Sequence, residues 1–252
     1  MRVWESRRRF GPLAINVTYR ASSTSEFEAI ERFRSSGHLR WPMSLVFLRP
    51  DGCLSRDRRH IIFTSRDLDL VESYLRCLGR PIRYSVSRTR RGKQAYYAQF
   101  SDVAFYDWLL SVGLMPRKSL TLGPIDVPDA YLSALARGLL DGDGTISVFT
   151  HRPTRARYPD YLYERLWVFF LSASVSHIEW LRARLRGRYG VDGYVERIVR
   201  KKRRDLYRLK FGKSESIKLL GNLYEDPTAP RLERKWRRWA EYAARCCAEG
   251  GT

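Results

Sequence analysis

The sequence predicts an α+β fold in which one arrangement of helices and strands occurs twice. The first observation is an apolar helix over 131–142 that leads into the closely spaced aspartates Asp141 and Asp143, and then into a β-prone segment. The second is a shorter copy of this helix near residues 41–54, which aligns Asp51 with Asp143. The third is that the predicted elements after each acid follow in the same order.

Composition restricts the class of protein. A chain of 252 residues, 44% of them hydrophobic, is long enough for one large domain or two small ones with ample core. Its 47 Lys and Arg against 27 Asp and Glu give a formal net charge of +20, which indicates a polyanionic partner, most commonly nucleic acid. No apolar run approaches the roughly 18 residues of a membrane span, so we expect an intracellular, DNA-associated protein without a membrane partner. The four cysteines form no C-x-x-C pair, which argues against a zinc site.

The predicted helix over 131–142 has two different faces. Pro128 and Asp129 suit its start, and Gly142 and Gly144 suit its end. Small residues line one face together with Asp141, namely Ala130, Ala134 and Gly138. Leucines line the opposite face, namely Leu132, Leu135 and Leu139. The leucine face requires a core. The small face suits close approach of a second helix, so two such helices would bring their acids together.

The elements after each acid form the repeat. Each half has an apolar β-like run, an amphipathic helix closed by a glycine, a hairpin with a basic tip, and a further helix. The expected elements are 59–66, 68–78, 82–100 and 103–112 in the first half, and 166–173, 176–189, 194–211 and 214–223 in the second. Each half ends in a Pro and Arg/Lys signature, LMPRKS or LERKWRR. The predicted organisation is a basic N-terminal extension over 1–40, a first repeat over 41–119, a linker over 120–128, a second repeat over 129–240 and a C-terminal tail over 241–252.

The segment ARGLLDGDG, residues 136–144, resembles the motif that names the LAGLIDADG homing endonucleases. With the repeat, the resemblance extends over about 41–239, and it is to the single-chain, two-repeat form of the family. It implies two pseudo-symmetric αββαββα repeats, with the motif helices packed at the centre and two antiparallel sheets forming a saddle over DNA. The activity it implies is site-specific, metal-dependent cleavage of double-stranded DNA by a monomer.

The chemistry expected of such a site depends on two carboxylates. Asp51 and Asp143 would hold Mg²⁺ near the scissile phosphates, because Mg²⁺ prefers hard oxygen ligands and two facing carboxylates repel without a cation. The resemblance also implies a basic residue just beyond the first strand, which helps to polarise the phosphate or water, and Arg66 matches that place. Since an arginine cannot act as a general base, the expected role of Arg66 is electrostatic support. The first motif departs from the second at three positions, Val46, Arg49 and Pro50. That departure puts the placement of Asp51, and so double-strand cleavage, in doubt.

Strand residues on the concave face and the two basic hairpin tips are the expected DNA contacts. Arg, Lys, Gln and Ser side chains hydrogen-bond base edges, and basic tips contact phosphates. The expected residues are Arg83, Ser85, Ser87, Arg88, Arg90, Arg91, Lys93 and Gln99 in the first half, and Arg200, Lys201, Lys202, Arg203, Arg204, Arg208 and Lys210 in the second. Two alternatives remain open. One is the same fold without nuclease chemistry, as an intron RNA maturase or a DNA-binding regulator, and the other is a purely structural nucleic-acid-binding protein.

Overall fold

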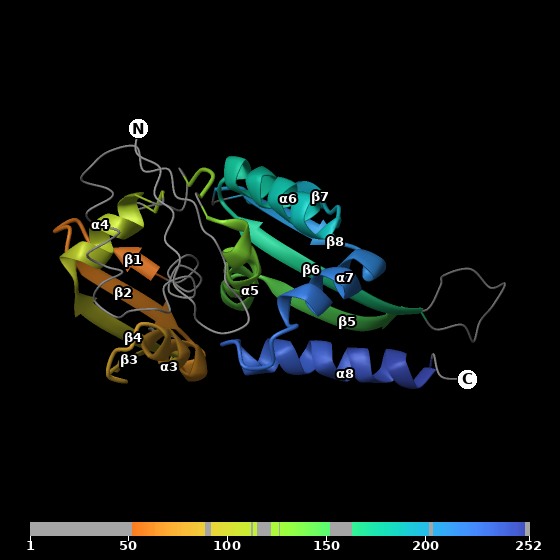
Figure 1. Cartoon of the computed structure of the whole chain (residues 1–252), viewed down its shortest axis with the longest axis horizontal. Helices are drawn as coiled ribbons and strands as arrows, with labels where there is room; N and C mark the ends of the chain where they lie inside the picture. The colour runs from red at the N-terminus through yellow and green to blue at the C-terminus, as the bar shows by residue number, and fades with distance from the viewer. Residues whose placement is uncertain are drawn as a thin grey trace, which may run out of the picture.

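The computed structural model describes residues 52–88, 92–111, 113–114, 122–125, 127–151, 163–201 and 204–249. The predicted N-terminal extension, the first motif helix and Asp51 therefore lie outside the described residues. Within them, two four-stranded antiparallel sheets and six α-helices form an α+β protein. Figure 1 shows the two halves side by side, with helix α5 between them. No helix in the described ranges is both long and apolar enough to cross a membrane.

The first half contains one sheet and two helices. Strands β1 (Gly52–Leu54) and β2 (His60–Ser65) precede helix α3 (Leu68–Cys77). The hairpin of β3 (Ser85–Arg88) and β4 (Gln94–Ser101) leads to helix α4 (Val103–Ser111). The strand order is β1-β2-β4-β3. Period-two burial along β2 turns Ile61 and Phe63 into the core and leaves Ile62 and Thr64 on the other face.

The second half repeats this topology. A single 3₁₀ turn (Asp129–Tyr131) leads into α5 (Leu132–Gly142), followed by β5 (Thr145–His151), β6 (Tyr163–Ser172) and α6 (Val175–Tyr189). The hairpin of β7 (Tyr194–Ile198) and β8 (Leu206–Phe211) precedes α7 (Lys213–Leu223) and α8 (Glu233–Glu249). The strand order is β5-β6-β8-β7, equivalent to that of the first sheet. The duplicated element order predicted from the sequence is confirmed for these segments.

Helix α5 belongs to both halves. Leu135 packs in the hydrophobic core of the first half, whereas Ala136 and Leu140 pack in that of the second. Leu139 is half-buried between the two cores. Of the expected leucine face, Leu135 therefore packs into the neighbouring half and Leu139 contacts both halves, while the second half uses the adjacent stripe of Ala136 and Leu140.

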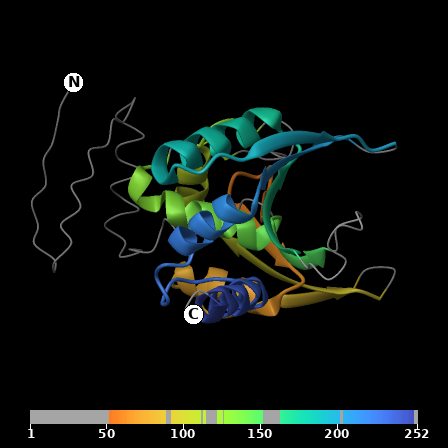
Figure 2. The same ribbon diagram turned by 90° about the vertical axis from the view of Figure 1, so that its right-hand side faces the viewer.

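Helix α8 was not foreseen as an element. It begins at Glu233, within the LERKWRR signature, and runs through Glu249, past the residue 240 where the sequence placed the end of the repeat. Figure 2 shows the helices on one side of the molecule and the strands of both sheets on the other. We call the sheet faces turned away from the helices the open faces.

Candidate nuclease site and DNA-facing surface

The end of α5 places Asp143 at a helix–strand junction. Asp143 is the C-cap residue of α5, and its backbone N–H donates to the Leu139 carbonyl. Its side chain is exposed, and only Gly144 separates it from β5. Gly144 is required by close packing, because a Cβ atom there would lie 2.6 Å from the Leu140 Cα atom. The motif thus delivers one carboxylate to solvent from a tightly packed turn.

Lys235 of α8 holds this turn from the inside. Its side chain is buried, and its Nζ atom donates to the carbonyl oxygens of Leu140 at 2.7 Å, and of Asp141 and Gly144 at 2.8 Å. A longer contact of 3.2 Å joins it to the Gly142 oxygen. The carbonyls of Leu140, Asp141 and Gly142 are among those that an α-helix leaves without partners at its C-terminus, where a positive charge is favourable, and Gly144 lies just beyond the helix. Burial lowers the pKa of Lys235 from 10.5 to about 8.

Asp141, the other acid of the motif, points inward. Its carboxylate accepts hydrogen bonds from the Tyr224 hydroxyl and from the Leu232 backbone N–H, each at 2.9 Å. Leu232 immediately precedes α8, so Asp141 fixes the start of the helix that carries Lys235. Burial raises the pKa of Asp141 from 3.8 to about 6. Asp141 is therefore a structural residue, and Asp143 is the acid of this motif that faces solvent.

Arg137 completes the junction one turn earlier, on the same side of α5 as Asp141. It is buried and donates from Nη1 to the Leu223 carbonyl at 2.7 Å, at the C-terminus of α7. Burial lowers its pKa from the ordinary value of 12.5. Arg137 and Asp141 are four residues apart on α5, and they anchor the helices that follow the second sheet. The charged positions of ARGLLDGDG therefore orient α5, α7 and α8 around Asp143.

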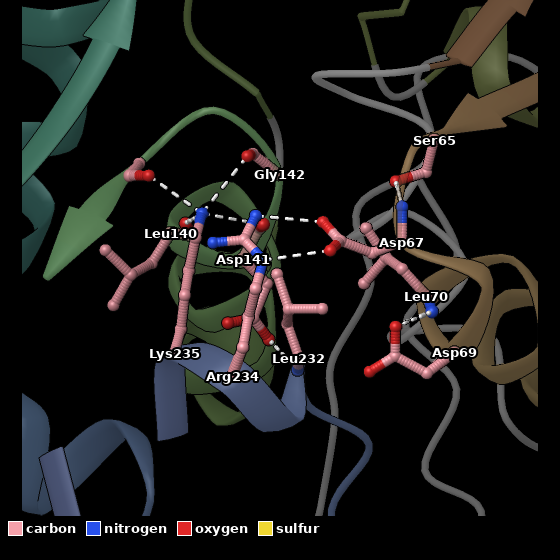
Figure 3. Close-up of polar contacts among 11 residues, drawn as sticks. Ser65, Asp67, Asp69, Leu70, Leu140, Asp141, Gly142, Leu232, Arg234 and Lys235 are labelled. Atoms are coloured by element: carbon pink, nitrogen blue, oxygen red, sulfur yellow. Dashed lines mark hydrogen bonds and ion pairs between the residues drawn. The ribbon is translucent and has the colours of Figure 1, made fainter. Parts of the chain in front are cut away.

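A contact between the two halves lies beside this junction. Asp67, in the loop after β2, forms a two-point ion pair with Arg234, at 2.9 Å to Nε and 2.8 Å to Nη2. Figure 3 shows Asp67 facing Arg234, with Lys235 reaching the end of α5. The hydrogen bonds from Arg234 lower the pKa of Asp67. Arg66 is exposed and lies in the same loop. Its electrostatic role stays a prediction.

The metal prediction can be tested only in part, because Asp51 lies outside the described residues. Among the residues that the structure describes, no group of three or more His, Cys, Asp or Glu side chains forms a candidate metal centre. Mg²⁺ commonly binds proteins through one or two carboxylates, with substrate phosphates and water filling the remaining positions. The exposed Asp143 carboxylate fits that kind of site.

The predicted contacts of the first hairpin divide between the two faces of the sheet. Arg83 and Lys93 are exposed beside the strands, whereas Arg90 and Arg91 lie outside the described residues. The strand register decides on which face of the sheet each of the remaining residues lies. The cross-strand pairs are Ser85 with Tyr97, Ser87 with Ala95, Gln99 with Ile62, and Arg88 with Gln94. Ser85, Ser87 and Gln99 share the open face with Ile62 and Thr64, whereas Arg88 is on the helix side.

The predicted contacts of the second hairpin are partly engaged within the protein. Arg200, Lys201 and Arg204 lie at its tip, and Lys202 and Arg203 fall outside the described residues. Arg208 and Lys210 lie on the open face, as the alternation predicts, while Leu209 and Phe211 are buried. Arg208 forms an ion pair with Glu196, and the Lys210 Nζ atom lies 3.4 Å from the centroid of the Trp167 ring.

Sequence reasoning missed Lys235 and the aromatic residues of the second open face. A lysine in a basic segment gives no sign that it is buried, because lysine is almost always exposed. In β6, both alternating sets are apolar, Leu166, Val168 and Phe170 on one side, and Trp167 and Phe169 on the other. Periodicity therefore identified the strand but could not identify its core face.

Comparison with known proteins identifies the fold. No protein-family model matches the sequence, and no curated protein matches it. Among solved structures, the meganuclease I-SmaMI bound to uncleaveable DNA aligns with a TM-score of 0.54 and 11% identity, over 83% of this chain and 90% of that chain. The I-SmaMI LAGLIDADG homing endonuclease bound to cleaved DNA gives 0.51 and 12%, over 83% and 90%.

A third structure, full-length DUF199/WhiA from Thermatoga maritima, gives a TM-score of 0.49 at 14% identity, over 90% of this chain and 67% of that chain. The two I-SmaMI structures match nearly their whole length and share the duplicated sheet topology. The chain therefore has the two-repeat fold of the LAGLIDADG homing endonucleases.

Proposed function

We propose that this protein is a site-specific endonuclease that cleaves double-stranded DNA in a metal-dependent reaction. The observation that carries the proposal is the Asp143 carboxylate, which is exposed at the end of α5, one residue before β5. The fold is shared with endonucleases whose structures contain DNA. The net charge of +20 supplies the attraction for a polyanion.

Asp143 would hold Mg²⁺ together with Asp51 of the first motif and with oxygens of the DNA backbone. Mg²⁺ bound there would activate water and stabilise charge on the phosphate. Lys235 and Gly144 fix the turn from which Asp143 projects, so its carboxylate needs little rearrangement to bind. Arg66 adds positive potential from the neighbouring half.

The test compares DNA cleavage by Asp143→Asn and by the wild-type protein. Both are incubated with a library of random-sequence duplexes in a buffer that contains Mg²⁺. The amide keeps the size of the side chain and loses the charge, so we expect cleavage to disappear while DNA affinity and melting temperature stay unchanged. Asp129→Asn is a matched control, because Asp129 is an exposed acid before the same helix. Wild-type cleavage by the Asp143→Asn protein would place the active site elsewhere.

The irregular first motif favours one alternative, a DNA-binding protein of the same fold that does not cleave. Pro50 cannot donate a backbone hydrogen bond and sits next to Asp51. Sequence-specific binding by the wild-type protein, without Mg²⁺-dependent cleavage of either strand, would support this alternative. Nicking of one strand, unchanged in Asp51→Asn, would show that only the second motif is active.

A further inference from the structure

Large aromatic side chains lie on the open face of the second sheet. Along β6, Leu166, Val168 and Phe170 are buried against the helices, with exposed fractions of 0–2%. Trp167 and Phe169 alternate with them, and both are only half-buried. Their cross-strand partners are Ser147 and Lys210, which are also not buried. The two rings therefore lie on the face that the helices do not cover.

These rings form one cluster with neighbours on the adjacent strands. The Phe149 ring lies 4.8 Å from that of Trp167, and the Trp167 ring lies 6.0 Å from that of Phe169, both edge to face. Tyr194 of β7 faces Lys210 across the sheet, with 48% of its surface exposed. We call Phe149, Trp167, Phe169 and Tyr194 the aromatic cluster. Tyr194 is joined to the other three rings through Lys210, whose Nζ atom lies 5.4 Å from the Tyr194 ring centroid. Rings grouped in this way on a solvated sheet mark a contact surface.

Two cations of this face, Lys210 and Arg208, are held close to the rings, and a third, Arg165, is exposed opposite Phe149. Lys210 Nζ is 3.4 Å from the Trp167 ring centroid, and the Arg208 guanidinium is 4.8 Å from that of Phe169. Arg208 is also paired with Glu196. Both side chains are thus engaged before any ligand arrives. The face therefore offers ring surface as well as hydrogen-bond donors.

The open face of the first sheet has a different chemistry. Ser85 and Thr64 flank Tyr97 in one cross-strand row, and Ser87 and Gln99 lie in the rows on either side of it. Hydroxyl and amide groups recognise base edges by hydrogen bonds. Among the described strand residues, the first open face carries one Phe, Tyr or Trp ring, Tyr97, whereas the second carries the four rings of the aromatic cluster.

We propose that the aromatic cluster recognises thymine through its 5-methyl group in the major groove. This inference rests on the proposed function, in that the protein binds duplex DNA. The thymine methyl is the apolar group that bases present in this groove, and a β-ribbon fits there. Stacking with an unpaired base is disfavoured, because Lys210 already occupies one face of the Trp167 ring. The net charge of +20 attracts the protein to the two phosphate backbones of the duplex, and the thymine methyl groups lie in the groove between them.

The test uses duplexes enriched by the full-length protein from a random library, bound without divalent metal so that no strand is cut. Each enriched duplex is remade with deoxyuridine in place of thymidine in one half of the site at a time. Each contacted methyl should contribute about fourfold in affinity, from about 0.8 kcal/mol of buried methyl surface. We expect weakening for one half of the site only, the half that faces the second sheet.

Variants assign the effect to the cluster. Trp167→Ser and Phe169→Ser should bind thymidine and deoxyuridine duplexes equally, whereas Trp167→Phe should keep most of the difference. Val199→Ser is the matched control, because Val199 is an apolar residue that follows β7 in the same half of the protein, 74% exposed and outside the cluster. Its thymidine preference should match that of the wild type.

Two outcomes would overturn the inference. Equal wild-type affinity for thymidine and deoxyuridine duplexes would show that no methyl group is recognised. Tighter binding of a single strand than of the duplex would show that the rings stack on unpaired bases. Cleavage of the enriched duplex in Mg²⁺ is measured in a separate assay. The two binding results therefore test the recognition of thymine, and the cleavage assay alone tests the proposed endonuclease activity.

Discussion

Lys235 provides the sharpest test of how the candidate site is held, through the variant Lys235→Met. Methionine has a similar length and no donor, so it leaves the carbonyls at the end of α5 buried without their partner. Three of the hydrogen bonds from Lys235 are 2.7–2.8 Å long. Hydrogen bonds to a charged group contribute about 1.5–3 kcal/mol each, so three contribute on the order of 6 kcal/mol.

Burial of the ammonium group opposes this gain. The pKa of Lys235 falls from 10.5 to about 8 mainly because the charge is desolvated, and this shift corresponds to about 3 kcal/mol at 1.36 kcal/mol per pH unit. The hydrogen bonds are the larger effect. We therefore expect Lys235→Met to lower the free energy of unfolding by about 3 kcal/mol at pH 7.

The assay is urea unfolding at pH 7, followed by circular dichroism. Lys201→Met is the control, because Lys201 is exposed at a hairpin tip, and its replacement should change stability by less than about 0.5 kcal/mol. If Lys235→Met proved as stable as Lys201→Met, the desolvation cost would cancel the hydrogen bonds. Lys235 would then not be what stabilises the turn before Asp143.

Three further predictions follow from the same region and from the charge of the chain. Gly144→Ala should lose at least about 2 kcal/mol of stability, because the added methyl group overpacks against Leu140. Gly187→Ala should gain about 0.5–1 kcal/mol, because Gly187 lies in α6 with open space around it. Equal effects of the two substitutions in thermal unfolding would contradict the packing argument. Between about pH 4 and pH 6 the folded protein keeps a proton on Asp141 that the unfolded chain releases, so this residue's contribution to stability is full below pH 4 and is lost as the pH rises through 6. The stability of the wild type relative to Asp141→Asn should thus fall by up to about 3 kcal/mol from pH 4 to 7, and a constant difference across a pH series would refute the raised pKa. Finally, if about eight Lys and Arg side chains contact phosphates, the slope of log affinity against log salt should be near −7, and a slope near zero in fluorescence titrations would exclude backbone binding.

The duplicated fold could be predicted because its signals are local. Helix and strand periods, the glycine at residue 190 with its left-handed φ of 59°, and the order of elements are all properties of neighbouring residues. The position of Asp143 could be predicted in the same way, because a helix that ends at Gly142 places the next residue at a turn. Short-range pattern was enough to find the helix, its end and the acid that follows it.

Tertiary structure alone decided how that acid is supported. Asp67 and Arg234 are 167 residues apart and Lys235 lies 91–95 residues from the carbonyls it binds, so no local pattern relates them. Which face of β6 is the core was equally undecided, because Trp167 and Val168 are both apolar. Only packing against α6 and α7 buries one set and leaves the other on the open face. The sequence by itself determined the repeat and the position of Asp143, whereas long-range packing determined which charges are buried and which rings remain exposed.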